Sequence, residues 1–93
     1  MEGGEKMNEI YVRLVDVPVD VKGIVKEDSN GDYNIYLNAR YVLEQQMMTY
    51  LHELAHIELG HLHSSRPVEE LENEADKRMT EMLTGKAASR SRG

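Results

Sequence analysis

The chain has 93 residues, a formal net charge of −6, and no cysteine, phenylalanine or tryptophan. This length fits one small domain, and the lack of cysteine excludes disulfides and thiolate metal ligands. The acidic balance argues against direct nucleic-acid binding, which normally needs a basic face. No stretch is apolar enough to span a membrane and the N-terminus lacks a signal-peptide pattern, so we expect a soluble cytoplasmic protein.

The first part of the chain predicts a sheet of three strands, at residues 10–16, 22–27 and 33–38. Asn30 and Gly31 lie between the second and third strands and predict a hairpin, because both residues tolerate positive φ. The sheet is expected to be antiparallel or mixed. If the third strand lies at an edge of the sheet, its free backbone groups can bind an extended peptide by strand addition.

The apolar spacing becomes helical from Val42 to Gly60, where the glycine is a natural stop. His52 and His56 lie almost opposite the apolar stripe of this helix and have apolar neighbours. A surface helix normally places plain charges opposite its core stripe, so both sides of this helix are expected to be covered. The predicted stripe consists of Leu43, Met47, Tyr50, Leu51, Leu54 and Ile57.

A turn at Pro67 precedes a second predicted helix, from about Val68 to Leu83. Strands followed by helices indicate an α+β fold, with the sheet packed on the first helix and on the second. We expect residues 10–84 to form one compact domain. Residues 1–9 and the basic tail at 85–93 are expected to be disordered.

The segment HELAH contains the pattern H-E-x-x-H at His52, Glu53 and His56. On a helix, residues i and i+4 share a face, so both imidazoles can hold one metal ion. The glutamate between them can take a proton from water at that metal, as in a zinc metallopeptidase. The pattern alone is only moderately specific, and a solvated helix face is the alternative.

A catalytic zinc needs a third protein ligand, which we expect from the acidic second helix. In helical projection Glu72 lies at the margin of the apolar stripe of that helix, so we assign it as the third ligand, with Glu74 as the alternative. Asp76 lies one turn further on the same side and can accept a hydrogen bond from a ligating histidine. Nitrogen and carboxylate ligands favour Zn²⁺ but admit other metals.

The donor that would stabilise a developing oxyanion stays open, because spacing does not choose among the candidates. His61 and His63 follow the first helix, and a third metal ligand from there is possible. Their spacing departs from the extended H-E-x-x-H-x-x-G-x-x-H pattern, however, so we expect exposed or hydrogen-bonding histidines. Tyr50 falls in the apolar stripe, which argues against it. The four candidates are Tyr36, Tyr50, His61 and His63.

The segments YNIYLN, QQMMTYLHELAHIELGH and ENEAD together resemble the ImmA/IrrE-type metallopeptidases of bacteria and their mobile elements, over roughly Val21 to Leu83. The chain also resembles a minimal gluzincin. The resemblance implies that His52 and His56 are metal ligands and Glu53 the catalytic glutamate. The form E-x-x-A-D in ENEAD again implies Glu72 as ligand. The family further implies a prophage or integrative element as source, and a helix-turn-helix repressor as substrate.

The leading hypothesis is a zinc metallo-endopeptidase with a zincin-like catalytic domain and a protein or peptide substrate. Two rival hypotheses remain. One is a non-catalytic, metal-stabilised interaction module that regulates a partner protein. The other is a metal-free binding protein whose acidic helix is simply solvated. Neither a nucleic acid nor a membrane is an expected partner.

Overall fold

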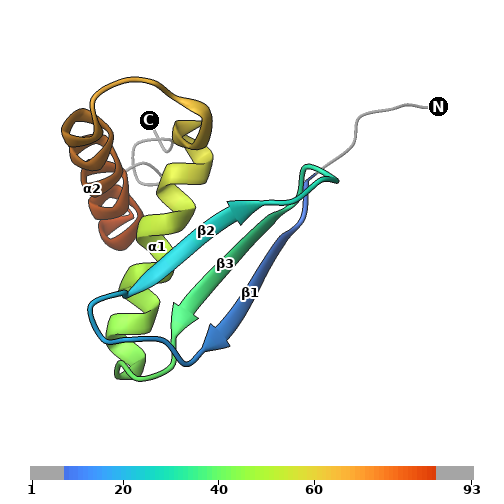
Figure 1. The fold of residues 1–93 in the computed structure, drawn as a ribbon. Helices are drawn as coiled ribbons and strands as arrows, with labels where there is room; N and C mark the ends of the chain where they lie inside the picture. Colours follow the sequence, from blue (N-terminus) through green and yellow to red (C-terminus); the bar gives the residue numbers. More distant parts are fainter. Residues whose placement is uncertain (1–7, 86–93) are drawn as a thin grey trace. The chain divides into compact units, whose positions relative to one another are not determined.

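A computed structural model of the chain describes residues 8–85. The predicted α+β class is confirmed, and each strand lies within one residue of its predicted limits. The elements are β1 (Ile10–Val15), β2 (Gly23–Glu27), β3 (Tyr33–Asn38), α1 (Leu43–Glu58), the short 3₁₀ turn η1 (His61–His63) and α2 (Val68–Thr84) (Figure 1).

Contacts within the chain divide it into two units, residues 1–46 and 47–93, and each unit is considered by itself. The compact domain expected at 10–84 therefore stays a prediction. The disorder expected at both ends falls almost entirely outside the described residues. No helix in the described part of the chain is long and apolar enough to cross a membrane.

The sheet of the first unit is mixed, and β3 is its central strand (Figure 1). β1 runs parallel to β3 with Val12 opposite Ile35, and β2 runs antiparallel to β3 with Val25 opposite the same Ile35. The prediction that the third strand could lie at an edge is therefore wrong. The connection from β1 to β2 crosses to the far side of β3, so the backbone of β3 is hydrogen-bonded along both sides. Strand addition to β3 is excluded within this sheet.

The hairpin predicted at Asn30 and Gly31 is confirmed. Gly31 has φ of 85°, a left-handed conformation that a residue with a Cβ adopts only with strain. The Asp28 carboxylate stabilises the turn by accepting hydrogen bonds from the backbone N–H groups of Asn30, at 2.9 Å, and Asp32, at 3.1 Å. Local side-chain bonding of this kind is what makes aspartate common in turns.

The buried side chain of Asn38 ties the β1–β2 connection to the end of β3. Its amide donates to the carbonyl oxygens of Val17, Pro18 and Val21, at 3.2, 3.0 and 2.7 Å. Its oxygen accepts the backbone N–H of Arg40 at 2.9 Å. Because every polar atom of Asn38 has a partner, the side chain can be buried without a desolvation penalty.

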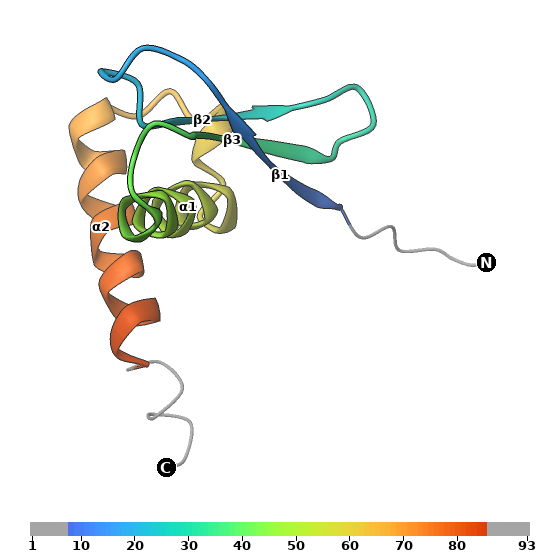
Figure 2. The same cartoon turned by 90° about the horizontal axis from the view of Figure 1, so that it is seen from below.

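The second unit contains α2 and all of α1 except its first turn, and the two helices lie side by side and cross steeply (Figures 1 and 2). The predicted stripe on α1 is wrong at its N-terminal end, where Leu43 and Met47 are 68% and 55% exposed. Periodicity identifies a face of a helix but not how far along the helix that face is covered. The buried side chains are instead Thr49, Ala55 and His56 on α1, with Leu71 and Ala75 on α2.

Ile35 is fully buried in the central strand, whereas Ile24 on β2 is 43% exposed. We expect Ile35→Ala to reduce the free energy of unfolding by about 3 kcal/mol, because it removes buried methylenes and leaves a cavity. The same change at Ile24 should cost about 1 kcal/mol or less. Urea denaturation of both variants checks this, and equal losses would contradict the described core.

Candidate metal centre

The two histidines of the H-E-x-x-H pattern lie one helical turn apart on α1, and their side chains converge. The Nε2 atoms of His52 and His56 are 3.1 Å apart. His56 is buried, and the imidazole of His52 is about one quarter exposed. The i, i+4 spacing thus brings two nitrogen donors to one point, as the sequence predicts.

Glu72 reaches the same point from α2. Its Oε1 lies 2.9 Å from His52 Nε2, and its Oε2 lies 3.2 Å from His56 Nε2. One ligand atom from each of His52, His56 and Glu72 can be chosen so that all three atoms lie within 4.8 Å of one another. We call these three residues the metal group. Ligands of a tetrahedral zinc with bonds of 2.0–2.1 Å are about 3.3 Å apart. The donor set and its spacing therefore fit one zinc ion.

The alternative third ligand, Glu74, lies elsewhere on α2. Its Oε1 is 2.9 Å from Nε2 of His61, and its carboxylate also pairs with the guanidinium of Arg66. Asp76 lies beside His52, with Oδ1 3.4 Å from Nδ1, a contact longer than an ordinary hydrogen bond. The structure thus brings Glu72, and not Glu74, to the histidine pair.

The contact of His61 with the metal group is the feature that sequence reasoning missed. Gly60 ends α1 with φ of 71°, and the chain then turns back through η1. This turn places His61 in a buried position, with Nδ1 2.9 Å from Nδ1 of His56. The sequence predicted an exposed or hydrogen-bonding His61, and the hydrogen-bonding alternative is confirmed, but its partners were not predicted. The neighbouring His63 is exposed.

Comparison with known protein families identifies the kind of domain. The family model for the IrrE N-terminal-like domain, a peptidase family, matches residues 8–85. The chain belongs to this family. No curated protein and no solved structure matches the chain significantly. The resemblance to ImmA/IrrE-type peptidases is therefore confirmed, and a metal-dependent peptidase is the activity typical of the family.

In this IrrE-type domain, burial lowers the pKa of His56. The charge of Glu72 opposes the shift, while His52 and His61 add to it. A lowered pKa favours the neutral imidazole, whose free lone pair is the form that binds metals.

Burial also raises the pKa of Glu53, the middle residue of the pattern. The nearby charge of Glu72 adds to the shift, while that of His52 opposes it. A carboxylate with a raised pKa is a stronger base than an ordinary glutamate, which suits a group that takes a proton from water.

Arg66 holds the pKa of Glu74 down at about 2, and His61 contributes in the same direction. Glu74 is therefore ionised at any physiological pH. Arg66 Nη1 donates to Glu74 Oε1 at 3.3 Å, and a longer contact of 3.5 Å joins Arg66 to Glu70. Both side chains of this ion pair are nearly half exposed, and pairs of this kind contribute little to stability.

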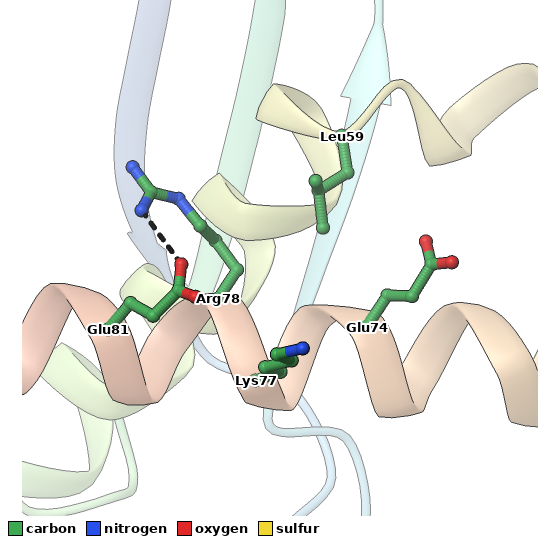
Figure 3. Close-up of a pocket in the computed structure, with 5 residues that line it drawn as sticks. All are labelled: Leu59, Glu74, Lys77, Arg78 and Glu81. Atoms are coloured by element: carbon green, nitrogen blue, oxygen red, sulfur yellow. Dashed lines mark hydrogen bonds and ion pairs between the residues drawn. The ribbon is translucent and has the colours of Figure 1, made fainter. Parts of the chain in front are cut away.

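A pocket of about 180 Å³ lies along α2 near the end of α1 (Figure 3). It shares Glu74 with the cluster around His61 but contains none of His52, His56 and Glu72. Arg78 on its wall donates to Glu81 at 3.3 Å. The lining side chains are Leu59, Glu74, Lys77, Arg78 and Glu81.

The raised pKa of Glu53 predicts a pH-dependent stability of the metal-free domain. The folded state binds the Glu53 proton more tightly than the unfolded chain does, so ionised Glu53 destabilises the folded state at pH 7. This cost vanishes as the pH falls through the folded-state pKa towards 4.5, the ordinary value. We therefore expect Glu53→Gln to raise the Tm in chelator at pH 7, by an amount that shrinks on acidification.

Scanning calorimetry at pH 7 and at pH 4 measures this difference. Glu69→Gln is the matched control, because Glu69 is an exposed acid on α2 and should show no such pH-dependent gain. A Tm for Glu53→Gln equal to or below that of the wild type at pH 7 contradicts the prediction.

Proposed function

We propose that this chain is a zinc-dependent endopeptidase in which His52, His56 and Glu72 hold the metal and Glu53 is the general base. The observation that carries the proposal is the convergence of two Nε2 atoms and one carboxylate within 4.8 Å. Membership of a peptidase family supports the reaction class. The same geometry supports Glu72 over Glu74 as the third ligand.

The chain's own groups supply a coherent path for peptide hydrolysis. When bound, zinc lowers the pKa of water and polarises the carbonyl of the peptide to be cut. The Glu53 carboxylate takes a proton as the water oxygen bonds to the carbonyl carbon. It then passes that proton to the nitrogen as the carbon–nitrogen bond breaks. In this proposal Asp76 accepts the Nδ1 proton of His52, which leaves Nε2 free to coordinate; the 3.4 Å contact between Oδ1 and Nδ1 supports this role.

For the substrate we propose a regulatory protein such as a helix-turn-helix repressor of a mobile element, acted upon in the cytoplasm. Family resemblance alone supports this choice. The acidic character of the chain supports a protein substrate over a nucleic acid.

Glu53→Gln is expected to keep one zinc per chain and to lose peptide cleavage, because the amide cannot accept the proton from water. Metal analysis of protein purified without added zinc, paired with a peptide-library assay, measures both properties. A wild type that holds one zinc but cleaves nothing supports the interaction module instead. A wild type without metal contradicts both of these readings.

Glu72→Gln is expected to weaken zinc binding at least about 100-fold, because it removes a charged ligand at a site with only three protein donors. Loss of a group outside the ligand set already costs about 10- to 100-fold. The matched control is Glu69→Gln, which removes an acid of the same helix that lies outside the cluster. Competition with a chromophoric chelator gives both dissociation constants. Similar values for the two variants would remove Glu72 from the ligand set.

A further inference from the structure

A continuous chain of polar contacts leads from the metal group to the surface of α2. His56 Nδ1 lies 2.9 Å from His61 Nδ1, and His61 Nε2 lies 2.9 Å from Glu74 Oε1. Glu74 is in turn paired with Arg66. His61, in the middle of this chain, is buried, whereas Glu74 and Arg66 are partly exposed.

The protons along this chain of polar contacts have only one possible arrangement if His56 Nε2 is a metal ligand. A ligating neutral imidazole carries its proton on the other nitrogen, so His56 Nδ1 must be a donor. Nδ1 of His61 must then accept this proton, and the remaining proton of His61 lies on Nε2. That Nε2–H donates to the Glu74 carboxylate, which acts only as an acceptor. Every donor therefore meets one acceptor.

We propose that His61 and Glu74 are positioning residues that hold His56 in the tautomer and orientation needed to bind zinc. This inference rests on the proposed function, since it takes His56 Nε2 as a ligand. Direct carboxylate–histidine pairs commonly serve this purpose in metal sites. The carboxylate nearest the far nitrogen of His52 is that of Asp76, at 3.4 Å. The corresponding carboxylate for His56 is that of Glu74, and the imidazole of His61 lies between them.

The geometry argues against two other roles for His61. It is not a ligand of the metal group, because both of its nitrogens are engaged, one by His56 and one by Glu74. It is also more than a packing residue. A buried imidazole of the opposite tautomer would set two N–H donors against each other at the His56 contact, and a buried unsatisfied donor costs about 1–3 kcal/mol.

Glu74 is the last acceptor in this series of polar contacts, on the side of the protein surface. Its surroundings explain why its carboxylate stays ionised there. Figure 3 shows its carboxylate projecting from α2 on the side of the helix where Leu59 lies. Arg66 keeps Glu74 ionised from the solvent side. An ionised acceptor attracts the Nε2 proton of His61 more strongly than a neutral one, and thereby selects that tautomer.

Two substitutions of His61 separate a positioning role from a structural one. The Oδ1 atom of asparagine lies where Nδ1 of histidine lies, so His61→Asn keeps an acceptor for His56. The amide of glutamine lies nearer the place of Nε2, so His61→Gln keeps a group for Glu74 and loses the acceptor for His56. Both changes put an amide of similar polarity at the same buried position.

We expect His61→Gln to raise the zinc dissociation constant about 10- to 100-fold, and His61→Asn to raise it less than about threefold. Chelator competition measures the affinity, and visible absorption of the Co²⁺-substituted protein reports the ligand geometry. Equal affinities and identical Co²⁺ spectra for both variants overturn the proposal. Wild-type protein that binds no zinc overturns the proposed function itself, which keeps the two failures distinguishable.

A second pair of matched variants tests the role of the Glu74 carboxylate. Glu74→Gln and Glu70→Gln each remove one carboxylate partner of Arg66, but only Glu74 contacts His61. We expect zinc affinity to fall for Glu74→Gln and to be unchanged for Glu70→Gln. Equal zinc affinities of the two variants exclude Glu74 from the positioning role.

Nitrogen-15 spectra of the histidine rings in the zinc-bound protein test the proton positions directly. We expect the proton on Nδ1 of His56 and on Nε2 of His61. A proton on Nδ1 of His61 overturns the proposal irrespective of any effect of the substitutions on folding.

Discussion

The side chains of His52, His56 and Glu72 bring three electron-pair donors close together, and the surrounding contacts depend on this arrangement. Lone pairs on two imidazoles and a carboxylate repel one another unless a proton or a cation lies between them. The helical spacing of His52 and His56 and the approach of Glu72 from α2 impose this proximity. Burial of His56 strengthens the constraint, because it disfavours neutralising the repulsion by protonating that ring.

The acidic side chains of α2 contact specific groups. Glu72 points to the imidazole pair, Asp76 to the far nitrogen of His52, and Glu74 to His61 and Arg66. Glu72 and Asp76 are four residues apart, share one face of α2 and both contact His52, whereas Glu74 between them points to His61 and Arg66. A uniformly solvated acidic face would show no such selectivity.

Much of the fold and of the cluster could be predicted because local periodicity encodes it. Two features follow from the directions in which side chains leave a strand or a helix. They are the strands predicted at 10–16, 22–27 and 33–38, and the approach of Glu72, rather than Glu74, to the histidine pair. The central place of β3 could not be predicted, because strand order depends on a long connection. The contact of His61 with His56 was also missed, since it depends on the left-handed turn at Gly60 and not on a repeating pattern.

The candidate ligands come from two different helices, and this has a mechanical consequence. His52 and Glu72 are 20 residues apart, so an ion held between them would cross-link α1 to α2 and close the loop between them. In a chain without cysteine, such a cross-link would take the place that a disulfide has in other small domains. Folding and chemistry would then depend on the same three side chains. Withdrawing the ion would loosen the helix pair at the same moment as it stopped the reaction.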